Sequence, residues 1–508
     1  MDVTSFLRSY AAVRRFWNNS CKPGLSQSLT LQSLLHRAAL TQFGRDHMFS
    51  SIANVAEFQN RVPLRNYEDY WIDYWQKDFP RLENQTWPGL NPFFAETSGT
   101  TTDITKYIPC SWDMLRSNRR AAVDLLVYHL ARRPESRVMG GKLFMLGGTS
   151  ALTELDSGIY SGDISGIAMR RVPWWVRSRC FPPTNLADLG DWDEKVPLIA
   201  EASRFEDIRL LGGTPSWLLL FIQALTDCQE DDCHLTSHYP NLELLVHGGV
   251  SFSPYRRRFE TLLEGSHAEL CEIYAASEGF FAVADRGDGE GLRLILDHGI
   301  FYEFVPVEEL HSRNPTRHWV ETIETDVDYA VVVSTCAGVW GYIIGDTVRF
   351  IDRDVPRLLV TGRISYTLSA FGEHLIAAEI DKAIVYAANS INAHVSDYSV
   401  GSIYPSASEA RGGHLYIVEF SDSLVDNDRL GVFAESVDES LREMNRDYSV
   451  HRAGDFGLQM PSFQAVPPGT FAAWMKKRDK LGGQNKVPRV INEPSLFDDL
   501  QRFAQRTQ

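Results

Sequence analysis

At residues 97–102 the chain reads Thr97-Ser98-Gly99-Thr100-Thr101-Thr102. Five hydroxyl side chains around one glycine can offer O–H and N–H donors to phosphate oxygens, and Gly99 lets the backbone approach closely. An apolar segment precedes these residues, and a strand-like segment follows them. They are not a Walker A loop, because Gly-x4-Gly-Lys-Ser/Thr occurs nowhere in the chain. From these residues alone, a phosphate loop and a Ser/Thr-rich surface turn both remain open.

A carboxylate, Glu278, stands at the end of an apolar run, four residues after Tyr274. Carboxylates at strand ends suit Mg²⁺, which takes one or two protein oxygens and completes its shell with water and nucleotide phosphates. Glu278 is therefore a candidate metal ligand. By itself, the pattern is more typical of a solvated turn glutamate beside a core tyrosine.

Three further strand ends carry glycine next to a polar residue. The pair Gly248-Gly249 would let a flat base lie against the backbone. The pair Gly345-Asp346 ends an apolar run, and an Asp in such a place commonly accepts from ribose hydroxyls. Arg363 follows at the next strand end, in Thr361-Gly362-Arg363. Taken singly, each pattern is also typical of a turn.

Composition limits the classes of protein that this chain can represent. Its 508 residues, 44% of them hydrophobic, predict two or more domains. A formal net charge of −16 argues against general attraction to nucleic acid or anionic lipid. Seven cysteines without CxxC spacing argue against a disulfide framework or a zinc cage, and favour a reducing cytoplasm. The uncharged residues 329–345 indicate two strands and a turn rather than a membrane span.

Hydrophobic periodicity predicts a mixed α+β architecture. Helices are expected at residues 28–43 and 113–130, and the first half is expected to be largely helical. Beyond about residue 240, short apolar runs separated by Gly, Asp and Pro predict sheet strands. A second set of helices and strands follows Gly372. We therefore predict two domains, residues 1–367 and 368–508.

In combination, these motifs have the order found in adenylate-forming enzymes, and the chain most resembles the GH3 family of acyl acid–amido synthetases, in its bacterial form. The resemblance spans almost the whole chain. It is carried by the loop at 97–102 and by Phe43-Gly44-Arg45-Asp46-His47, residues 61–64 and 67–70, His247-Gly248-Gly249-Val250, residues 254–257, 274–281 and 302–306, and Gln484-Asn485-Lys486-Val487-Pro488-Arg489.

The resemblance implies a large N-terminal adenylate-forming domain, with a β-barrel and sheets flanked by helices, and a smaller mobile α+β lid domain. It also implies ATP and Mg²⁺ as cofactors, Glu278 as the metal ligand, and Lys486 as a catalytic residue at the α-phosphate and carboxylate oxygens. The remaining implied contacts to ATP are Ser98, Gly99, Thr100 and Thr101 at the phosphates, Gly249 and Tyr274 at the adenine, Ser277 beside Glu278, and Asp346 with Arg363 at the ribose.

By this resemblance the protein is expected to adenylate a carboxylic acid and transfer the acyl group to an amine, most simply an amino acid. A thioester ligase that uses coenzyme A or a carrier protein is the first alternative, and a non-catalytic nucleotide-binding protein is the second. We expect a cytoplasmic monomer with no nucleic-acid or membrane partner. One departure from the plant members is Glu373-His374, where those proteins carry a lysine near the position of His374.

Overall fold

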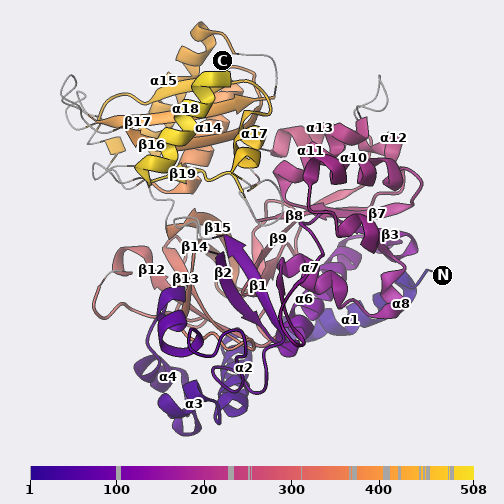
Figure 1. The fold of residues 1–508 in the computed structure, drawn as a ribbon, viewed down its shortest axis with the longest axis vertical. Coiled ribbons are helices and arrows are strands. Elements are labelled where there is room, and N and C mark those ends of the chain that lie inside the picture. The colour runs from indigo at the N-terminus through magenta and orange to yellow at the C-terminus, as the bar shows by residue number, and fades with distance from the viewer. Residues whose placement is uncertain are drawn as a thin grey trace. The chain divides into compact units, whose positions relative to one another are not determined.

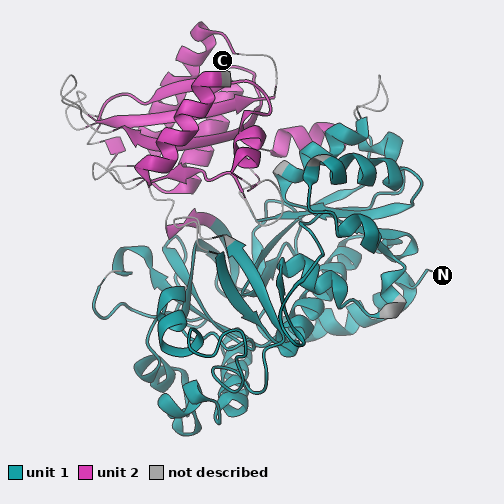
Figure 2. Ribbon diagram, in the orientation of Figure 1, with its two compact units in different colours: residues 1–99, 103–249, 265–360 teal, residues 100–102, 250–264, 361–508 magenta. Residues whose placement is uncertain are grey.

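A computed structural model gives the fold of the chain (Figure 1), and packing divides it into two compact units, which Figure 2 colours separately. The first unit comprises residues 1–99, 103–249 and 265–360, and the second comprises 100–102, 250–264 and 361–508. The predicted domain boundary at residue 367 stays a prediction. The structure describes residues 2–98, 105–226, 234–249, 252, 255–310, 312–364, 368, 375–403, 412–421, 425–445, 448–449, 452, 458–478, 480 and 486–507.

The first unit is built on one 11-stranded sheet. Strands β6, β3, β7, β8 and β9 pair in parallel. The recorded pairs on the other side of β9 are antiparallel. In sheet order the strands are β12 (Ile300–Pro306), β13 (Asp328–Thr335), β14 (Tyr342–Asp352), β15 (Arg357–Arg363), β11 (Leu292–Leu294), β10 (Gly279–Val283), β9 (Glu269–Ala276), β8 (Leu244–Gly248), β7 (Ile208–Gly213), β3 (Lys142–Met145) and β6 (Cys180–Phe181).

The chain folds into these strands because of their side chains. Every residue of β13 after Asp328 is buried, and its Val-Val-Val run packs well on a pleated surface with both faces covered. The family resemblance predicts a β-barrel in addition to sheets. The described strands of this sheet form an open order that begins at β12 and ends at β6. The outer edge of β12 pairs instead with the segment at His318, whose backbone exchanges two 2.8 Å hydrogen bonds with Phe304. This contact covers part of the edge that a closing strand would occupy.

A second, four-stranded sheet and the helices complete the first unit. The sheet order is β2 (Thr105–Cys110), β1 (Phe93–Ser98), β5 (Ile159–Gly162) and β4 (Thr153–Asp156). The helices are α1 (Thr4–Ser20), α2 (Pro23–Ala38), α3 (Gln42–Asp46), α4 (Val55–Arg61), α5 (Tyr67–Tyr70), α6 (Trp112–Arg132), α7 (Ile164–Arg170), α8 (Trp174–Arg177), α9 (Thr184–Ala187), α10 (Trp192–Ser203), α11 (Pro215–Thr226) and α12 (Leu235–His238).

The second unit places helices on both faces of a four-stranded sheet. Along β17 (Gly413–Phe420), Tyr416 and Val418 belong to one core and Leu415 and Ile417 to another, because successive strand residues point to opposite faces. The first core includes α14 (Ala377–Ser390) and α15 (Asn427–Met444), and the second includes α17 (Thr470–Lys477) and α18 (Pro494–Thr507). The remaining elements are β18 (Ser462–Val466), β16 (Val395–Ile403), β19 (Val490–Ile491) and α13 (Arg256–Leu262).

Two expectations for the first half need correction. The helix predicted at 28–43 ends at Ala38, because the Thr41 hydroxyl bonds the Ala38 carbonyl at 2.7 Å and caps α3 by accepting from the Gly44 amide. The first half is also less helical than predicted, since β1 to β7 all lie before residue 240. Several of these strands have only two to four residues, too few to produce a clear alternation in the sequence.

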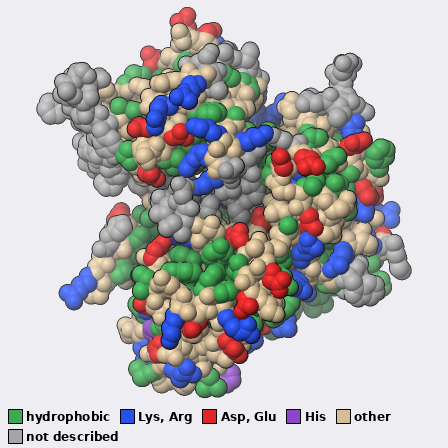
Figure 3. All heavy atoms as spheres, viewed as in Figure 1, with side chains coloured by type: hydrophobic (Ala, Val, Ile, Leu, Met, Phe, Trp, Pro, Cys, Tyr) green, Lys and Arg blue, Asp and Glu red, His purple; other side chains and the backbone are tan. Residues whose placement is uncertain are grey.

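Other expectations agree with the structure. The predicted helix at 113–130 is α6, and the uncharged residues 329–345 form parts of β13 and β14 with a turn between them. In the part of the chain that is described, no helix combines the length and apolar character that crossing a bilayer requires. Side chains of both charge signs are present on the face shown in Figure 3.

The N-terminus of α17 is capped by a buried carboxylate. Glu419, on β17, accepts from the backbone amides of Gly469 at 2.9 Å and Phe471 at 3.0 Å. Burial, together with the nearby carboxylate of Asp397, its partner across β16 and β17, raises the pKa of Glu419 to about 7, against the opposing effect of these hydrogen bonds.

We predict that Glu419→Gln flattens the pH dependence of stability. An acid whose folded pKa is raised contributes a stability that is complete below its unfolded pKa, near 4.5, and is lost as the pH rises to about 7. The free energy of unfolding, measured by urea titration from pH 4.5 to 7, should therefore fall less steeply in the variant than in the parent. Glu439→Gln, at an exposed position of α15, is the matched control. Equal slopes in all three proteins would contradict the prediction.

Candidate functional site

The carboxyl ends of neighbouring parallel strands meet at one edge of the large sheet. Strands β7, β8 and β9 run in parallel, with Gly213 opposite His247 and Gly248 opposite Ile273. Gly249 therefore follows the end of β8 at the same edge where Ser277 follows the end of β9. Ligands of open α/β sheets bind at such an edge, outside the carboxyl ends of the strands.

The double glycine at the end of β8 has two separate physical reasons. A Cβ on Gly248 would lie 2.4 Å from the backbone oxygen of Ile273, so no side chain fits between these strands. Gly249 has φ +86°, a left-handed conformation that glycine adopts without strain. The positive φ thus favours glycine at the end of β8, and the contact of Gly249 with a flat base stays a prediction.

The predicted metal ligand lies in the tight connection between β9 and β10. Ala276 and Gly279 form a pair across the two strands, which leaves only Ser277 and Glu278 in the turn. Both residues are buried, with 6% and 7% of their surface exposed. Carboxylate oxygens are ligands that Mg²⁺ prefers, so the donor chemistry at Glu278 fits this ion, with the rest of its shell supplied by water and phosphates.

A hydrogen bond joins two of the predicted residues across the sheet. The Tyr274 hydroxyl donates to Oδ2 of Asp346 at 2.9 Å, although 72 positions separate the two residues in the sequence. The ring of Tyr274 is itself held in the core, with its centroid 5.0 Å from that of Phe281. The structure thus fixes the hydroxyl that orients the Asp346 carboxylate.

A β-bulge brings Asp346 into this position. Ala330 pairs with Thr347 and Val332 with Ile343, so four residue steps on β14 face two on β13. The extra residues include Gly345, whose φ of +94° is left-handed. Bulges of this kind bend a strand and re-aim its side chains. The Gly-Asp pair that the sequence singled out is therefore a bulge within β14 rather than an ordinary turn.

Arg65 and Tyr70, from the N-terminal part of the chain, brace the start of β14. The Arg65 amide donates to the Gly341 carbonyl at 2.9 Å, and the Ile343 amide donates to the Arg65 carbonyl at 2.9 Å. The Tyr70 hydroxyl donates to the Trp340 carbonyl at 2.6 Å and lies 2.7 Å from its amide. These residues support the strand that carries Asp346. Tyr70 lies in a segment that was singled out only by resemblance, and Arg65 lies just outside these segments.

A glycine loop at the end of β3 was missed by the sequence reasoning. Gly147 and Gly148 follow β3, whose carboxyl end lies at the same edge of the sheet. Lys195, a buried residue of α10, donates to the carbonyls of Gly148 at 2.6 Å and Ala187 at 3.2 Å. Burial lowers the pKa of Lys195 to about 8, against the opposing effect of nearby carboxylates. The run Gly147-Gly148-Thr149-Ser150 after an apolar segment was the signal that could have identified the loop.

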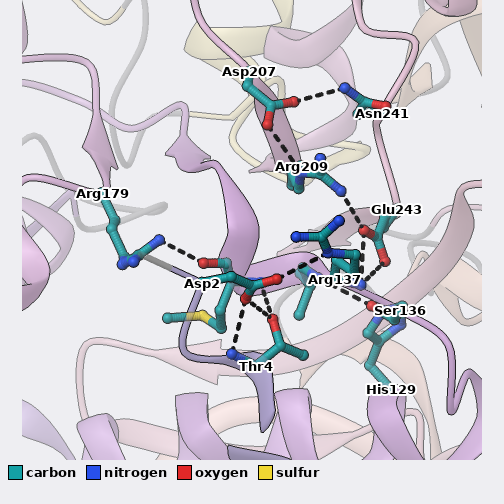
Figure 4. Close-up of polar contacts among 12 residues, drawn as sticks. Asp2, Thr4, His129, Ser136, Arg137, Arg179, Asp207, Arg209, Asn241 and Glu243 are labelled. Carbon is teal, nitrogen blue, oxygen red and sulfur yellow. Dashed lines mark hydrogen bonds and ion pairs between the residues drawn. The ribbon is translucent and has the colours of Figure 1, made fainter.

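The amino ends of the same strands are held by ion pairs (Figure 4). Nη1 of Arg209, on β7, donates to Oε1 of Glu243 at 2.9 Å, and the Arg137 amide donates to both Glu243 oxygens at 2.8 and 2.9 Å. Beside them, Oγ of Ser136 lies 2.9 Å from Nε2 of His129. Charged groups thus lock the edge opposite the candidate site, and the site edge itself carries glycines and short polar residues.

Elsewhere in the first unit, Asp124, Asp297 and His298 present ligand atoms within 4.8 Å of one another. In the described part of the chain this trio is the one group of metal-binding type. Arg14 already bonds it, because Nε donates to Asp124 at 2.9 Å and Nη1 donates to Asp297 at 2.6 Å. We therefore interpret this trio as part of a buried ion-pair cluster that joins α1 to α6.

The structure leaves several predicted residues without a tested role. Ser98 ends β1, and Gly99, Thr100 and Thr101 lie outside the described residues, as do Glu373 and His374. Arg363 ends β15, and Lys486 is exposed and precedes β19. Both residues belong to the second unit, so their part in nucleotide binding stays a prediction.

Comparison with protein families finds three matching domains along the chain. Residues 12–199 match the GH3 family N-terminal domain, residues 293–363 the GH3 family central domain, and residues 378–495 the GH3 family C-terminal domain. Together the three matches cover more than half of the 508 residues. Their order is the order of the domains in the family.

Individual relatives are more distant. The indole-3-acetic acid-amido synthetase GH3.8 of Oryza sativa subsp. indica is 25% identical over 339 residues, which are 62% of this chain and 54% of that protein. The match thus spans about half the length of that relative. Two solved structures share the fold. The GH3.15 acyl acid amido synthetase has a TM-score of 0.77 at 17% identity, with 98% of this chain and 96% of that chain covered. A 2-hydroxyisobutyryl-CoA ligase with bound 2-HIB-AMP has a TM-score of 0.62 at 15% identity, with 94% and 91% covered.

We predict that Tyr274→Phe weakens ATP binding by roughly fivefold to tenfold, because it removes a charge-assisted hydrogen bond that orients Asp346. Isothermal titration calorimetry of the parent and the variant would measure this change. Tyr302→Phe is the matched control, since this buried hydroxyl donates to the Phe281 carbonyl and makes no recorded bond to Asp346. An unchanged ATP affinity in Tyr274→Phe would show that the Tyr274–Asp346 pair lies outside the nucleotide site.

Proposed function

The chain belongs to the GH3 family, and from this premise we propose that it is a ligase that uses ATP and Mg²⁺ to adenylate a carboxylic acid and then forms an amide with an amine, most simply an amino acid. One observation carries the proposal beyond family membership. The edge that holds Gly249, Ser277 and Glu278 belongs to the same sheet as the bonded pair Tyr274 and Asp346.

In the first half-reaction, a carboxylate oxygen of the acid attacks the α-phosphorus of ATP, and pyrophosphate leaves. The proposed role of Gly249 and Tyr274 is to hold the adenine. Asp346 and Arg363 are proposed to hold the ribose, Asp346 by accepting from its hydroxyls and Arg363 by donating to its oxygens. Glu278 would supply a carboxylate oxygen to Mg²⁺, with Ser277 beside it in the turn. Bound there, Mg²⁺ would neutralise charge on the phosphates and orient them.

Lys486 is the proposed catalytic residue. An ammonium group beside the reacting phosphorus offsets the negative charge that develops as pyrophosphate departs. Ser98, Gly99, Thr100 and Thr101 are proposed to hold the phosphates through hydroxyl and backbone N–H donors. In the second half-reaction, the amine nitrogen attacks the acyl carbon, AMP leaves with the electron pair of the broken C–O bond, and the nitrogen loses a proton.

The experiment that tests the function is a substrate screen. The protein would be incubated with ATP, Mg²⁺, mixed carboxylic acids and mixed amino acids, and mass spectrometry would detect AMP and a new amide. Aryl acids are the first choice, because the relatives are named for indole-3-acetic acid. Coenzyme A in place of the amino acids tests the thioester alternative. AMP formed only with coenzyme A would overturn the amide assignment, and no AMP with any acid would indicate a non-catalytic nucleotide-binding protein.

We predict that Lys486→Ala slows acyl-adenylate formation by about 10²- to 10³-fold, as expected when one electrostatic stabiliser is lost. Nucleotide affinity should remain close to that of the parent, because the proposed adenine and ribose contacts come from other residues. Transfer from a synthetic acyl-adenylate to the amine should slow less. Both half-reactions can be followed in single-turnover assays.

The matched control for Lys486→Ala is Lys477→Ala. Lys477 is half-exposed on α17 and pairs with Asp499 at 3.2 Å, so its loss removes a surface charge of the same unit. This variant should retain both half-reactions. Equal slowing of both half-reactions in Lys486→Ala would point to a folding defect, and no slowing of either would remove Lys486 from the mechanism.

A further inference from the structure

Arg489, three residues after Lys486, is a buried residue whose guanidinium bonds to three other residues. Nη1 donates to Oδ1 of Asp397 and, at 3.2 Å, to the carbonyl of Tyr398. Nη2 donates to the hydroxyl of Tyr255 at 2.7 Å. The guanidinium carbon also lies 4.4 Å from the centroid of the Tyr398 ring, within cation–π distance. Arg489 therefore occupies one fixed position inside the second unit.

The backbone around Arg489 is fixed as well. The Val400 amide donates to the Arg489 carbonyl at 2.8 Å, and the Ser399 hydroxyl donates to the Pro488 carbonyl at 2.7 Å. Val490 then pairs with Val400 where β19 joins β16. Only Val487 stands between this anchored segment and Lys486, whose side chain is exposed. The anchor therefore limits the volume in which the ammonium group can move.

The third partner, Tyr255, comes from a distant part of the sequence. It lies 234 residues before Arg489 and six residues after Gly249, directly before α13. Its side chain is buried, and the same segment is also tied to the second unit by Arg257, which donates to Asn392 at 3.2 Å. One buried hydrogen bond thus links the segment that follows the β8 strand end to the segment that carries Lys486.

Removing Arg489 itself would be a poor test of its role. Asp397 is buried, and it stands opposite Glu419, a second buried acid, across β16 and β17. Loss of the guanidinium would leave the Asp397 carboxylate without its cation, and breaking a buried pair in this way strongly destabilises the fold. The Tyr255 hydroxyl can be removed without a change in charge, so it gives the sharper experiment.

We propose that Arg489 is a positioning residue for Lys486, and that the Tyr255 hydroxyl sets the orientation of Arg489 and thereby the reach of the lysine. This inference rests on the proposed function of Lys486 in adenylation. Arg489 and Tyr255 are not expected to touch the substrate. They act on the reaction through Lys486. Tyr255 would accordingly affect the first half-reaction, in which the lysine ammonium acts, more than the second.

The test is a double-mutant cycle of Tyr255→Phe and Lys486→Ala. Loss of one hydrogen bond to a charged group should slow acyl-adenylate formation by roughly fivefold to tenfold in the parent background. In the Lys486→Ala background the same change should slow it by less than about twofold, because residues that act through one another are not additive. Equal slowing by Tyr255→Phe in both backgrounds would overturn the proposal, since a purely structural role is additive.

Tyr448→Phe is the matched control. The Tyr448 hydroxyl donates to Asp438 at 2.7 Å, and Arg452 bonds the same carboxylate at 2.6 Å, so the second unit contains another buried Tyr–Asp–Arg cluster. The bonds described for the Tyr448 hydroxyl and the Arg452 guanidinium go to Asp438 and to the Leu458 carbonyl. Loss of the Tyr448 hydroxyl should lower the melting temperature of the protein without changing the rate of acyl-adenylate formation. If Tyr448→Phe slowed adenylation as much as Tyr255→Phe, the effect would be one of stability alone.

Hydrogen–deuterium exchange of residues 486–491 separates this inference from the proposed function. Exchange there should be faster in Tyr255→Phe than in the parent and unchanged in Tyr448→Phe. If the parent forms no AMP with any acid, the proposed function falls. Faster exchange in Tyr255→Phe alone would then still support the anchoring of this segment. Unchanged exchange in Tyr255→Phe would overturn the anchoring role.

Discussion

The parallel pairing of β8 with β9 is the constraint on which the candidate site depends. Gly248 lies opposite Ile273 with no room for a Cβ, so the two strands end at a fixed offset and at the same edge. This register brings the left-handed Gly249 and the buried turn of Ser277 and Glu278 to neighbouring strand ends. A one-residue slip would turn every side chain of β9, including Tyr274, to the opposite face of the sheet.

The two edges of the parallel strands carry different chemistry. Ion pairs such as Arg209 with Glu243 satisfy the charges at the amino ends, where they stabilise the fold. The carboxyl ends carry glycines and hydroxyls, which leave backbone groups close to any ligand. The carbonyls of the β3 loop already accept from Lys195, so this part of the edge is fixed by the protein itself. Rigid strand ends of this kind hold a ligand with little loss of conformational entropy.

The Asp346 carboxylate shows how much support a single polar group can require. A bulge in β14 turns it, the Tyr274 hydroxyl holds it, and Arg65 and Tyr70 hold the turn from which β14 starts. In the second unit, buried Arg489 gives comparable support to an exposed lysine. In both places a group proposed to act on the substrate is exposed or half-buried, and buried residues such as Tyr274, Tyr70 and Arg489 help to fix it.

The sequence by itself determined the order of the motifs, and through that order the family, the mixed α+β fold and the candidate residues. Local patterns such as Gly248-Gly249 and Val331-Val332-Val333 were sufficient, because close backbone approach and a buried strand each require particular residue types at adjacent positions. Strand β16 has no clear local pattern, for the opposite reason. Its buried residues include Asp397 and Ser399, polar side chains whose partners come from other elements.

Only the tertiary structure decided which distant residues meet. The Tyr274–Asp346 bond spans 72 positions and depends on sheet register and on the bulge in β14. The Tyr255–Arg489 bond spans 234 positions and depends on a buried charge. No local pattern encodes such a pair, because each partner alone is an ordinary core tyrosine, turn aspartate or surface-type arginine. Their chemistry arises when packing removes water from both partners at once, and that is a property of the whole fold.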